Sequence, residues 1–524
     1  MKSVEQNHNG GCAIACAMVA MLLVGCGGGS GTGAGLETVP SLVFSVQAFE
    51  PPASALRSTA STSTGYSSAA SVTPSFIALG ALSEAKALAA TSTVGPRQIG
   101  AARQVPLTMS LAATQQQMTW QPSAQGGLVS ALSFSAEGAY GLRLGVLVQK
   151  LPASALLRVY RQDQPTARFE VTGQGVLKAI ERNLEGGVMG EAAATWWTPD
   201  TGGDEATLEI ELPAGIPTNS VQIAVPTVSH LFVDLSLPVE TEFALQAKIN
   251  ESDPCNIDAT CRDSYASLGN AIARMVYTSA GKTYLCTGTL LNDRDSTATP
   301  YFVTANHCIS NQAEASTLQT HWFYRSPICN SRTLFSGTVR RTGGATLLYA
   351  SDSTDVSFLR LADVPPSGAV FAAWDANAQA FGSAVTGLHH PAGDLLKISS
   401  GAISGNSSCR TINDTQFSCS GLSGNFYRVN WTEGTTEGGS SGSGIFRGGA
   451  LIGTLYGGSA VCSNSASSDY YGRFDVAYAA ALYRWLSPGA VSVTPPVTAS
   501  TVLQNWIEQL RGRPGLTPRQ MQLP

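Results

Sequence analysis

Residues 435–444 decide the fold class, and they read Thr435-Thr436-Glu437-Gly438-Gly439-Ser440-Ser441-Gly442-Ser443-Gly444. The glycines around Ser441 allow a tight backbone turn that presents a hydroxyl together with free N–H groups. Since Gly/Ser runs are common in loops, this segment alone would be a weak signal. Two motifs upstream of it supply the missing context.

A histidine and an aspartate stand at the ends of two predicted strands. His307 directly follows the apolar run 301–305, and Asp355 directly precedes the run 356–361. A serine hydroxyl becomes a good nucleophile only when a base held in one tautomer lies within hydrogen-bond reach. The order His, Asp, Ser is that of the chymotrypsin-type triad. We therefore predict Ser441 as nucleophile, His307 as general base and then general acid, and Asp355 as the group that orients His307.

The serine turn is also predicted to stabilise negative charge that develops during a reaction. The backbone N–H groups of Gly439 and Ser441 would form an oxyanion hole, in which one donor contributes about 3 kcal/mol. Taken singly, each candidate also fits an ordinary role: His307 as a packed histidine, Asp355 as a turn residue, Ser441 as a loop serine. Their joint occurrence in motif favours the catalytic interpretation.

Length and composition limit the remaining possibilities. The chain has 524 residues, 43% of them hydrophobic and 13% charged, with 54 glycines, so two or three β-rich domains are expected. The net charge is −5 and no Lys/Arg run stands out, which argues against nucleic acid as a partner. The adjacent His389 and His390 would point to opposite faces of a strand, one packed and one exposed. We therefore expect no metal and no other cofactor.

The N-terminus, residues 1–25, is predicted to be a targeting segment. Its apolar run from Cys12 to Val24 is too short to span a bilayer as a helix. The run ends in Leu23-Val24-Gly25-Cys26, which resembles a bacterial lipobox and implies a lipid anchor on Cys26, with the outer membrane as the expected location. The alternative is an ordinary secretory signal, and hence a secreted protein.

Composition divides most of the remaining chain. Residues 26–99 are rich in Gly, Ser, Thr and Ala, which predicts a low-complexity tether. Residues 489–524 are predicted to be a linker and a short C-terminal helix. No catalytic constellation lies in 100–248, so a propeptide or accessory domain is expected there. Its short apolar runs predict a β-sandwich, with strands at 128–134, 142–148, 206–212, 221–225 and 231–235.

The cysteines outline a further domain. Of the 11 cysteines, eight lie in the stretch from Cys255 to Cys462. An even set confined to one stretch of an exported chain predicts disulfides. The stretch falls within residues 249–488, which also hold the three candidate catalytic residues.

Further motifs in the same domain belong together: Cys255-Asn256-Ile257-Asp258, Cys286-Thr287-Gly288, Tyr301-Phe302, Thr304-Ala305, His307-Cys308, His389-His390-Pro391, Gly439-Ser440-Ser441-Gly442-Ser443 and Tyr471-Gly472-Arg473. They resemble those of the bacterial lysyl endopeptidases, in the trypsin-like superfamily. The resemblance implies an all-β, chymotrypsin-like fold of two six-stranded antiparallel barrels with the triad between them. It also implies the disulfides Cys255–Cys462, Cys261–Cys329 and Cys286–Cys308. Cys409 and Cys419 have no counterpart there and are expected to close a hairpin of their own.

The resemblance bears on substrate choice as well. Asp469 stands where the family has a pocket carboxylate that pairs with a substrate Lys or Arg, and the alternative is a solvated loop aspartate. Tyr456, followed by Gly457, replaces the family's histidine. The tryptophan that partners that histidine has no clear match near Cys419. We therefore expect a substrate pocket at Asp469, Tyr456 and Gly457 that prefers Lys and leaves Arg open.

Two positions concern activation. Ser440 replaces the aspartate with which trypsin-like zymogens bind a newly freed N-terminus, and lysyl endopeptidases share this serine. Activation is therefore expected without that ion pair. Lys248 lies just before the expected mature start near Asn250, which favours self-processing there. An exposed linker lysine is the alternative.

The sequence as a whole predicts an exported serine endopeptidase that works as a monomer on protein or peptide substrates and cleaves after Lys. The alternative, from another class, is a surface-binding lipoprotein whose protease-like domain is inactive. The complete set of His307, Asp355 and Ser441 favours the enzyme.

Overall fold

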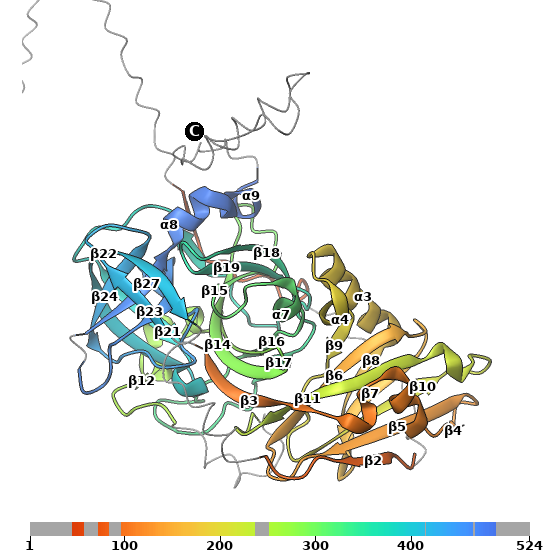
Figure 1. Ribbon diagram of the computed structural model, residues 1–524. Coiled ribbons are helices and arrows are strands. Elements are labelled where there is room, and N and C mark those ends of the chain that lie inside the picture. Colours follow the sequence, from red (N-terminus) through yellow and green to blue (C-terminus); the bar gives the residue numbers. More distant parts are fainter. Residues whose placement is uncertain are drawn as a thin grey trace, which may run out of the picture. The chain divides into compact units, whose positions relative to one another are not determined.

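Antiparallel strands dominate the regular structure of the chain (Figure 1). The computed structural model describes residues 44–56, 72–82, 96–235, 251–413, 416–464 and 467–488. The predicted signal segment, Cys26, Lys248 and the predicted C-terminal helix lie outside these described residues. Within them, no helix is both long and apolar enough to cross a membrane.

The C-terminal part of the described chain forms a closed barrel. Its strands are β21 (Ala384–His389), β22 (Lys397–Asn413), β24 (Phe426–Glu433), β25 (Gly444–Arg447), β26 (Ala450–Gly458) and β27 (Ser468–Arg473). They follow the order β26-β25-β21-β22-β24-β27, and β27 pairs back with β26, which closes the ring. Buried apolar side chains fill this barrel, among them Val429, Ile445 and Tyr471.

A second set of antiparallel strands forms the first barrel in chain order. Its strands are β13 (Ile272–Ser279), β14 (Lys282–Leu291), β15 (Tyr301–Ala305), β16 (Gln319–Trp322), β18 (Ala345–Ser351) and β19 (Val356–Leu361). The order is β16-β13-β14-β15-β19-β18, with β17 (Val339–Arg341) beyond β16, and among the described strands no pairing joins β18 back to that end. The predicted all-β two-barrel fold is confirmed, with the difference that hydrogen bonds close only one of the barrels.

An apolar layer joins the two barrels. It contains Val303 and Phe358 from the first barrel and Leu388 and Phe446 from the second. Three short C-terminal helical segments pack on it: α8 (Phe474–Ala477), η6 (Tyr478–Leu482) and α9 (Tyr483–Leu486). The barrels are therefore held against each other by the same burial of apolar surface that fills each one.

Residues 75–78 and 97–231 form a β-sandwich, the architecture expected for 100–248. One sheet has the order β2-β5-β10-β7-β8, with strands β2 (Ser75–Ala78), β5 (Leu128–Ser135), β10 (Glu205–Leu212), β7 (Leu156–Arg161) and β8 (Gln164–Thr172). The other has the order β3-β11-β6-β9, with strands β3 (Arg97–Gln104), β11 (Gln222–Leu231), β6 (Gly141–Lys150) and β9 (Thr195–Trp197). Apolar side chains of both sheets and Val176 of helix α3 (Gly173–Glu185) fill the space between them.

One strand of the sandwich is longer than the sequence indicated. Two strands were expected at 221–225 and 231–235, whereas the structure has the single strand β11. Its pairing register with β6 shifts between Ala224 and Thr227. Pro226 lies in that interval and has no N–H for a ladder hydrogen bond, which accounts for the apparent break in the sequence.

The sheet that contains β3 continues into the first barrel. β3 pairs with β11 on one side and with β14 on the other, where Thr283 lies opposite Gly100 and Tyr284 opposite Gln98 (Figure 1). An ion pair of 2.6 Å between Arg97 and Glu251 lies at the start of β3. Backbone hydrogen bonds thus connect the sandwich to the barrel.

In the described parts of 26–99, for which composition predicted a tether, two complete strands are present and β3 begins at Arg97. β2 joins the sandwich by pairing with β5, and β1 (Ser45–Val46) pairs with β20 (Ala373–Asp375), a strand between the two barrels. The Gly, Ser and Thr content of this range conceals a short apolar alternation around Phe44 and Val46, and that alternation suits an edge strand.

The eight cysteines of the barrel domain are all paired. The bonds are Cys255–Cys462, Cys261–Cys329, Cys286–Cys308 and Cys409–Cys419. The first three are those that the family resemblance implies. The fourth closes the hairpin of β22 and β23 (Gln416–Ser420), as expected.

The Cys286–Cys308 bond should contribute measurably to stability. It closes a loop with a sequence separation of 22, and a constraint of that length on the unfolded chain corresponds to about 3 kcal/mol. We expect the double variant Cys286→Ser, Cys308→Ser to lose that much unfolding free energy in urea titrations. A variant as stable as the wild type would show that the bond does not constrain the unfolded chain.

Candidate active site

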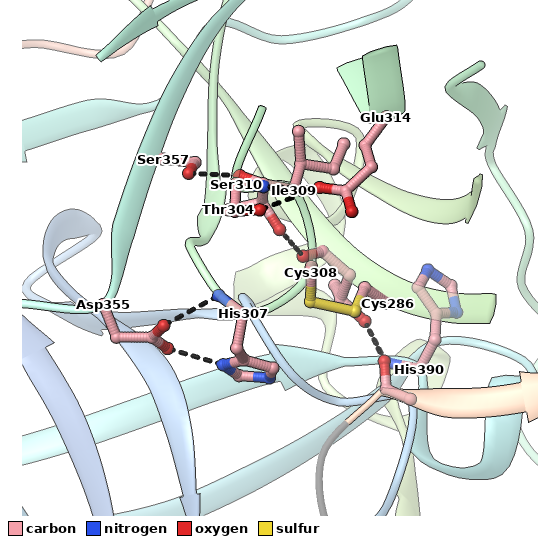
Figure 2. The surroundings of a disulfide bond; sticks show 12 residues. Cys286, Thr304, His307, Cys308, Ile309, Ser310, Glu314, Asp355, Ser357 and His390 are labelled. Carbon is pink, nitrogen blue, oxygen red and sulfur yellow. Dashed lines mark hydrogen bonds and ion pairs between the residues drawn. A yellow bond between two sulfur atoms is a disulfide. The ribbon is translucent and has the colours of Figure 1, made fainter. Parts of the chain in front are cut away.

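His307 and Asp355 meet because the strands beside them are neighbours. β15 ends at Ala305 and β19 begins at Val356, and these two residues pair directly. Figure 2 shows the result: the backbone N–H of His307 donates to Oδ1 of Asp355 at 2.9 Å, and Nδ1 of His307 lies 2.7 Å from Oδ2. Asp355 has a φ of 49°, in the left-handed region that Asp tolerates better than most residues.

This pair fixes the tautomer of His307. Asp355 is 3% exposed, and burial raises the pKa of its carboxyl while the neighbouring imidazole acts in the opposite direction. A charged carboxylate only accepts hydrogen bonds, so Nδ1 carries the proton and the lone pair of neutral His307 lies on Nε2. Nε2 is buried and has no hydrogen-bond partner among the described residues. It is therefore able to accept a proton from a group placed beside it.

The turn that carries His307 is tied down on its far side. The disulfide Cys286–Cys308 joins β14 to the residue directly after His307 (Figure 2). The hydroxyl of Ser357 donates to the carbonyl of Ile309 at 2.5 Å. Both links limit the movement of the imidazole relative to Asp355.

Ser441 lies in the turn between β24 and β25 of the second barrel. Gly439 and Gly442 have φ values of 101° and 79°, a conformation that favours glycine. A Cβ on Gly439 would lie 3.0 Å from the backbone N of Gly393 and from the carbonyl O of His390, so a side chain has no room there. The N–H groups of Gly439 and Ser441 donate to no other described residue. Both donors are therefore available to a bound group.

A buried histidine supports the residue before Ser441. Nδ1 of His389 lies 2.8 Å from the hydroxyl of Ser440, and Nε2 lies 3.0 Å from the hydroxyl of Ser399. Burial lowers the pKa of His389 to about 3, so the imidazole is neutral. Ser440, the residue expected to replace the zymogen aspartate, is thus held by a neutral partner.

The sequence-based expectation for the adjacent histidine was wrong. His390 was expected to be exposed if His389 was packed, but both are buried. Nδ1 of His390 lies 2.9 Å from the carbonyl of Asp394, because the chain after β21 folds back through the short turn Pro391–Gly393.

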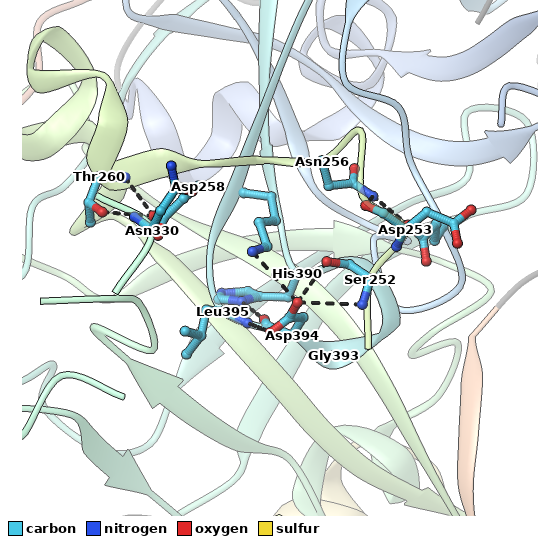
Figure 3. A network of polar contacts seen from close by, with 12 residues as sticks. Ser252, Asp253, Asn256, Asp258, Thr260, Asn330, His390, Gly393, Asp394 and Leu395 are labelled. Atoms are coloured by element: carbon cyan, nitrogen blue, oxygen red, sulfur yellow. Dashed lines mark hydrogen bonds and ion pairs between the residues drawn. The ribbon is translucent and has the colours of Figure 1, made fainter. Parts of the chain in front are cut away.

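The first residues of the barrel domain hold the loops around Ser441. Oε1 of Glu437 accepts from the backbone N–H of Asp253 at 2.8 Å and from the side chain of Asn256. The Ser252 hydroxyl donates to Oδ2 of Asp394 at 2.6 Å (Figure 3). The segment directly after the expected mature start is therefore attached to the loop that leads into the candidate nucleophile.

Asp469 is part of β27 and is fully buried, so it is not a solvated loop residue. Its Oδ2 accepts from Nε1 of Trp431 at 2.6 Å and from the Thr436 hydroxyl at 2.8 Å. Burial raises the pKa of Asp469 to about 6, against the opposing effect of these hydrogen bonds and of one from the N–H of Ala460. A buried carboxylate with no cationic partner among the described residues favours a cation supplied by a ligand.

Tyr456 lies between His307 and an aromatic side chain that the sequence did not reveal. Its ring centroid is 5.7 Å from that of His307 and 4.3 Å from that of Phe417. Its hydroxyl lies 2.7 Å from that of Thr411, in the hairpin closed by Cys409–Cys419. The sequence offered no tryptophan near Cys419. The aromatic residue that could have been recognised is Phe417, which lies in β23 together with Cys419.

Gly457 allows this aromatic contact. It has a φ of 149°, and a Cβ there would lie 2.9 Å from the Phe417 ring.

The site residues that sequence reasoning missed are Trp431, Glu437 and Phe417, since each acts through a partner distant in the chain.

Two barrels that present a histidine–aspartate pair and a glycine-flanked serine turn define the serine endopeptidase class. Comparison with known proteins gives the family. A model described as "Lysyl endopeptidase, C-terminal domain" matches residues 249–472, and one described as "Lysyl endopeptidase N-terminal domain" matches residues 73–232. The lysyl endopeptidase of Pseudomonas aeruginosa is 31% identical over 387 residues, which cover 71% of this chain and 78% of that protein. The chain belongs to the lysyl endopeptidase family.

Similar solved structures include two bacterial proteins. The active form of the Rv3671c protease from M. tuberculosis is 15% identical, covers 46% of this chain and 91% of its own, and has a TM-score of 0.29. The MamO protease domain from Magnetospirillum magneticum is 10% identical, covers 41% of this chain and 98% of its own, and has a TM-score of 0.30.

The carboxylate of Asp355 should matter far more to turnover than to folding. In Asp355→Asn, the amide can donate to Nδ1 and so favours the wrong tautomer of His307. We expect kcat on peptide substrates to fall by roughly 10⁴, with near-ultraviolet circular dichroism unchanged. Asn306→Ala, next to His307, is the matched control. If Asp355→Asn retained wild-type kcat, the assigned orienting role would be wrong.

Proposed function

We propose that this chain is an exported serine endopeptidase that cleaves peptide bonds after Lys through His307, Asp355 and Ser441. Ser441 Oγ attacks the carbonyl carbon while Nε2 of His307 takes its proton. The N–H groups of Gly439 and Ser441 bind the oxyanion. His307 then gives the proton to the leaving amine, and water hydrolyses the acyl-enzyme by the same steps. The observation that carries this proposal is the unpaired Nε2 of a histidine whose Nδ1 is held by a buried carboxylate.

The same observation weighs against an inactive protease-like domain in a surface-binding lipoprotein. Such a domain has no use for an imidazole whose Nδ1 is held by a buried carboxylate while its Nε2 is left unpaired.

Asp469 is proposed to select the basic side chain. Trp431 and Thr436 hold its Oδ2 by hydrogen bonds, and a substrate ammonium would neutralise the buried charge. Tyr456 and Phe417 would line the approach with aromatic surface suited to the aliphatic stem of Lys. Because Tyr456 adds no positive charge where the family has histidine, Arg is the alternative substrate side chain.

Location and maturation form part of the proposal. A signal at 1–25 would place a lipid on Cys26, and the enzyme would act as a monomer on proteins or peptides at the cell envelope, or be secreted. The sandwich would be a propeptide or accessory domain of the barrel domain, residues 249–488.

Self-processing after Lys248 is testable. We expect N-terminal sequencing of the purified protein to find a start near Ile249 in the wild type and an uncut chain in Ser441→Ala. A start near Ile249 in both would assign the cut to another protease, and no cut in either would make the sandwich permanent.

Substrate preference and its pH dependence test the role of Asp469. Because the pKa of Asp469 is about 6, its carboxyl is protonated below that pH and charged above it. The ratio of kcat/KM on a Lys substrate to that on a matched norleucine substrate should rise as pH increases through 6, since titrations that affect both substrates equally cancel in the ratio. Asp469→Asn should make the ratio low and independent of pH.

A peptide-library cleavage profile of the full chain provides the broader check. It should show cleavage after Lys or Arg that Asp469→Asn largely removes. Unchanged preference in the variant would place Asp469 outside the pocket.

A further inference from the structure

Residues 44–56, here termed the strap, belong to the N-terminal part of the chain but pair with the barrel domain. Ser45 lies opposite Asp375, and Val46 lies opposite Trp374. Further along, Phe49 and Phe371 exchange both backbone hydrogen bonds at 2.9 Å. The strap thus adds an antiparallel strand to an existing edge, in the manner of a peptide bound by β-augmentation.

The edge that the strap covers is the connection between the two barrels. β19 of the first barrel ends at Leu361 and β21 of the second begins at Ala384, and residues 371–376 lie between them. The side chain of Asn292, directly after β14, donates to the carbonyl of Gln47 at 3.0 Å, which anchors the strap to the first barrel.

Apolar side chains of the strap enter the cores on both sides of this connection. Leu56 is 3% exposed and belongs to the first barrel's core, together with Phe371. At the other end, Phe44 packs with the layer between the barrels, and its ring centroid is 6.0 Å from that of Tyr478. The strap therefore spans the junction and buries apolar surface at each end.

We propose that the strap is a permanent part of the barrel domain and stays bound to it when the chain between them is cut. This goes beyond the proposed catalytic function and does not depend on it. The strap lies outside both ranges that match the family models, 73–232 and 249–472. The strap binds to residues 371–376 of the barrel domain. The side chains of Phe44 and Leu56 enter the apolar clusters on either side of these residues. The occupant of this surface is therefore a segment of this chain itself.

The consequence concerns attachment. Cleavage after Lys248, if it occurs as proposed, would leave the N-terminal fragment bound through the strap and through the β3–β14 pairing. Whatever anchors the N-terminus would then continue to hold the mature domain. Release would need a second cut before the strap, or loss of both contacts.

The test separates the strap from the sandwich. Recognition sequences for a site-specific protease are placed within 57–71 and 236–250 of the full Ser441→Ala chain, which removes self-processing. After both cuts, size-exclusion chromatography with mass spectrometry follows the three fragments. We expect the strap fragment to elute with the barrel fragment at micromolar concentration. Elution of the strap fragment alone would overturn the proposal.

A matched pair of variants locates the binding surface. Leu56→Asp places a charge in the first barrel's core and should release the strap fragment, whereas Ala48→Asp, at an exposed strap position, should leave it bound. If Leu56→Asp does not fold, the doubly cut Ser441→Ala chain with the native Leu56 still shows whether the strap fragment stays bound. Equal retention of both Asp variants would contradict the assigned socket.

Discussion

The carboxylate of Asp355 holds His307 by two hydrogen bonds at once, and the proposed chemistry depends on that constraint. One oxygen accepts from the backbone of His307 and the other from its ring, so neither position nor tautomer of the imidazole is free. The register of β15 against β19 brings the two residues together. The disulfide Cys286–Cys308 and the aromatic ring of Tyr456 then surround the histidine on other sides.

The serine turn is set by a different kind of interaction. The neutral pair of His389 and Ser440 holds it. The carboxylate of Glu437 also accepts a hydrogen bond from the start of the barrel domain. Trypsin-like zymogens achieve the same end with a buried ion pair at the new N-terminus. Here Asp253 and Asn256 approach the loop from within the chain. The proposed maturation near residue 249 would therefore need no insertion of a charged terminus.

The sequence predicted those features that depend on residue type and on local position in the chain. His307 and Asp355 stand at strand ends, and the expected sandwich follows from short apolar runs, whereas the two barrels were implied by the family resemblance. The implied disulfides came from the family resemblance alone. The predictions that failed or were not made concern features that depend on a turn of the chain or on contacts between distant residues. His390 is buried because a turn folds over it, and Phe417 reaches Tyr456 only through a hairpin. The strap was hidden because its few apolar residues lie within a Gly/Ser/Thr-rich range.

The central claim is that Ser441 is activated by His307 in the chain as it stands, and covalent labelling tests it most directly. A fluorophosphonate reacts with a serine only when a neighbouring base activates its hydroxyl. The full-length protein is treated with the probe, digested and analysed by mass spectrometry. The account predicts one adduct, on Ser441, that is absent from His307→Ala. No adduct on the folded wild type, or an adduct on Ser440 or Ser443, would contradict it.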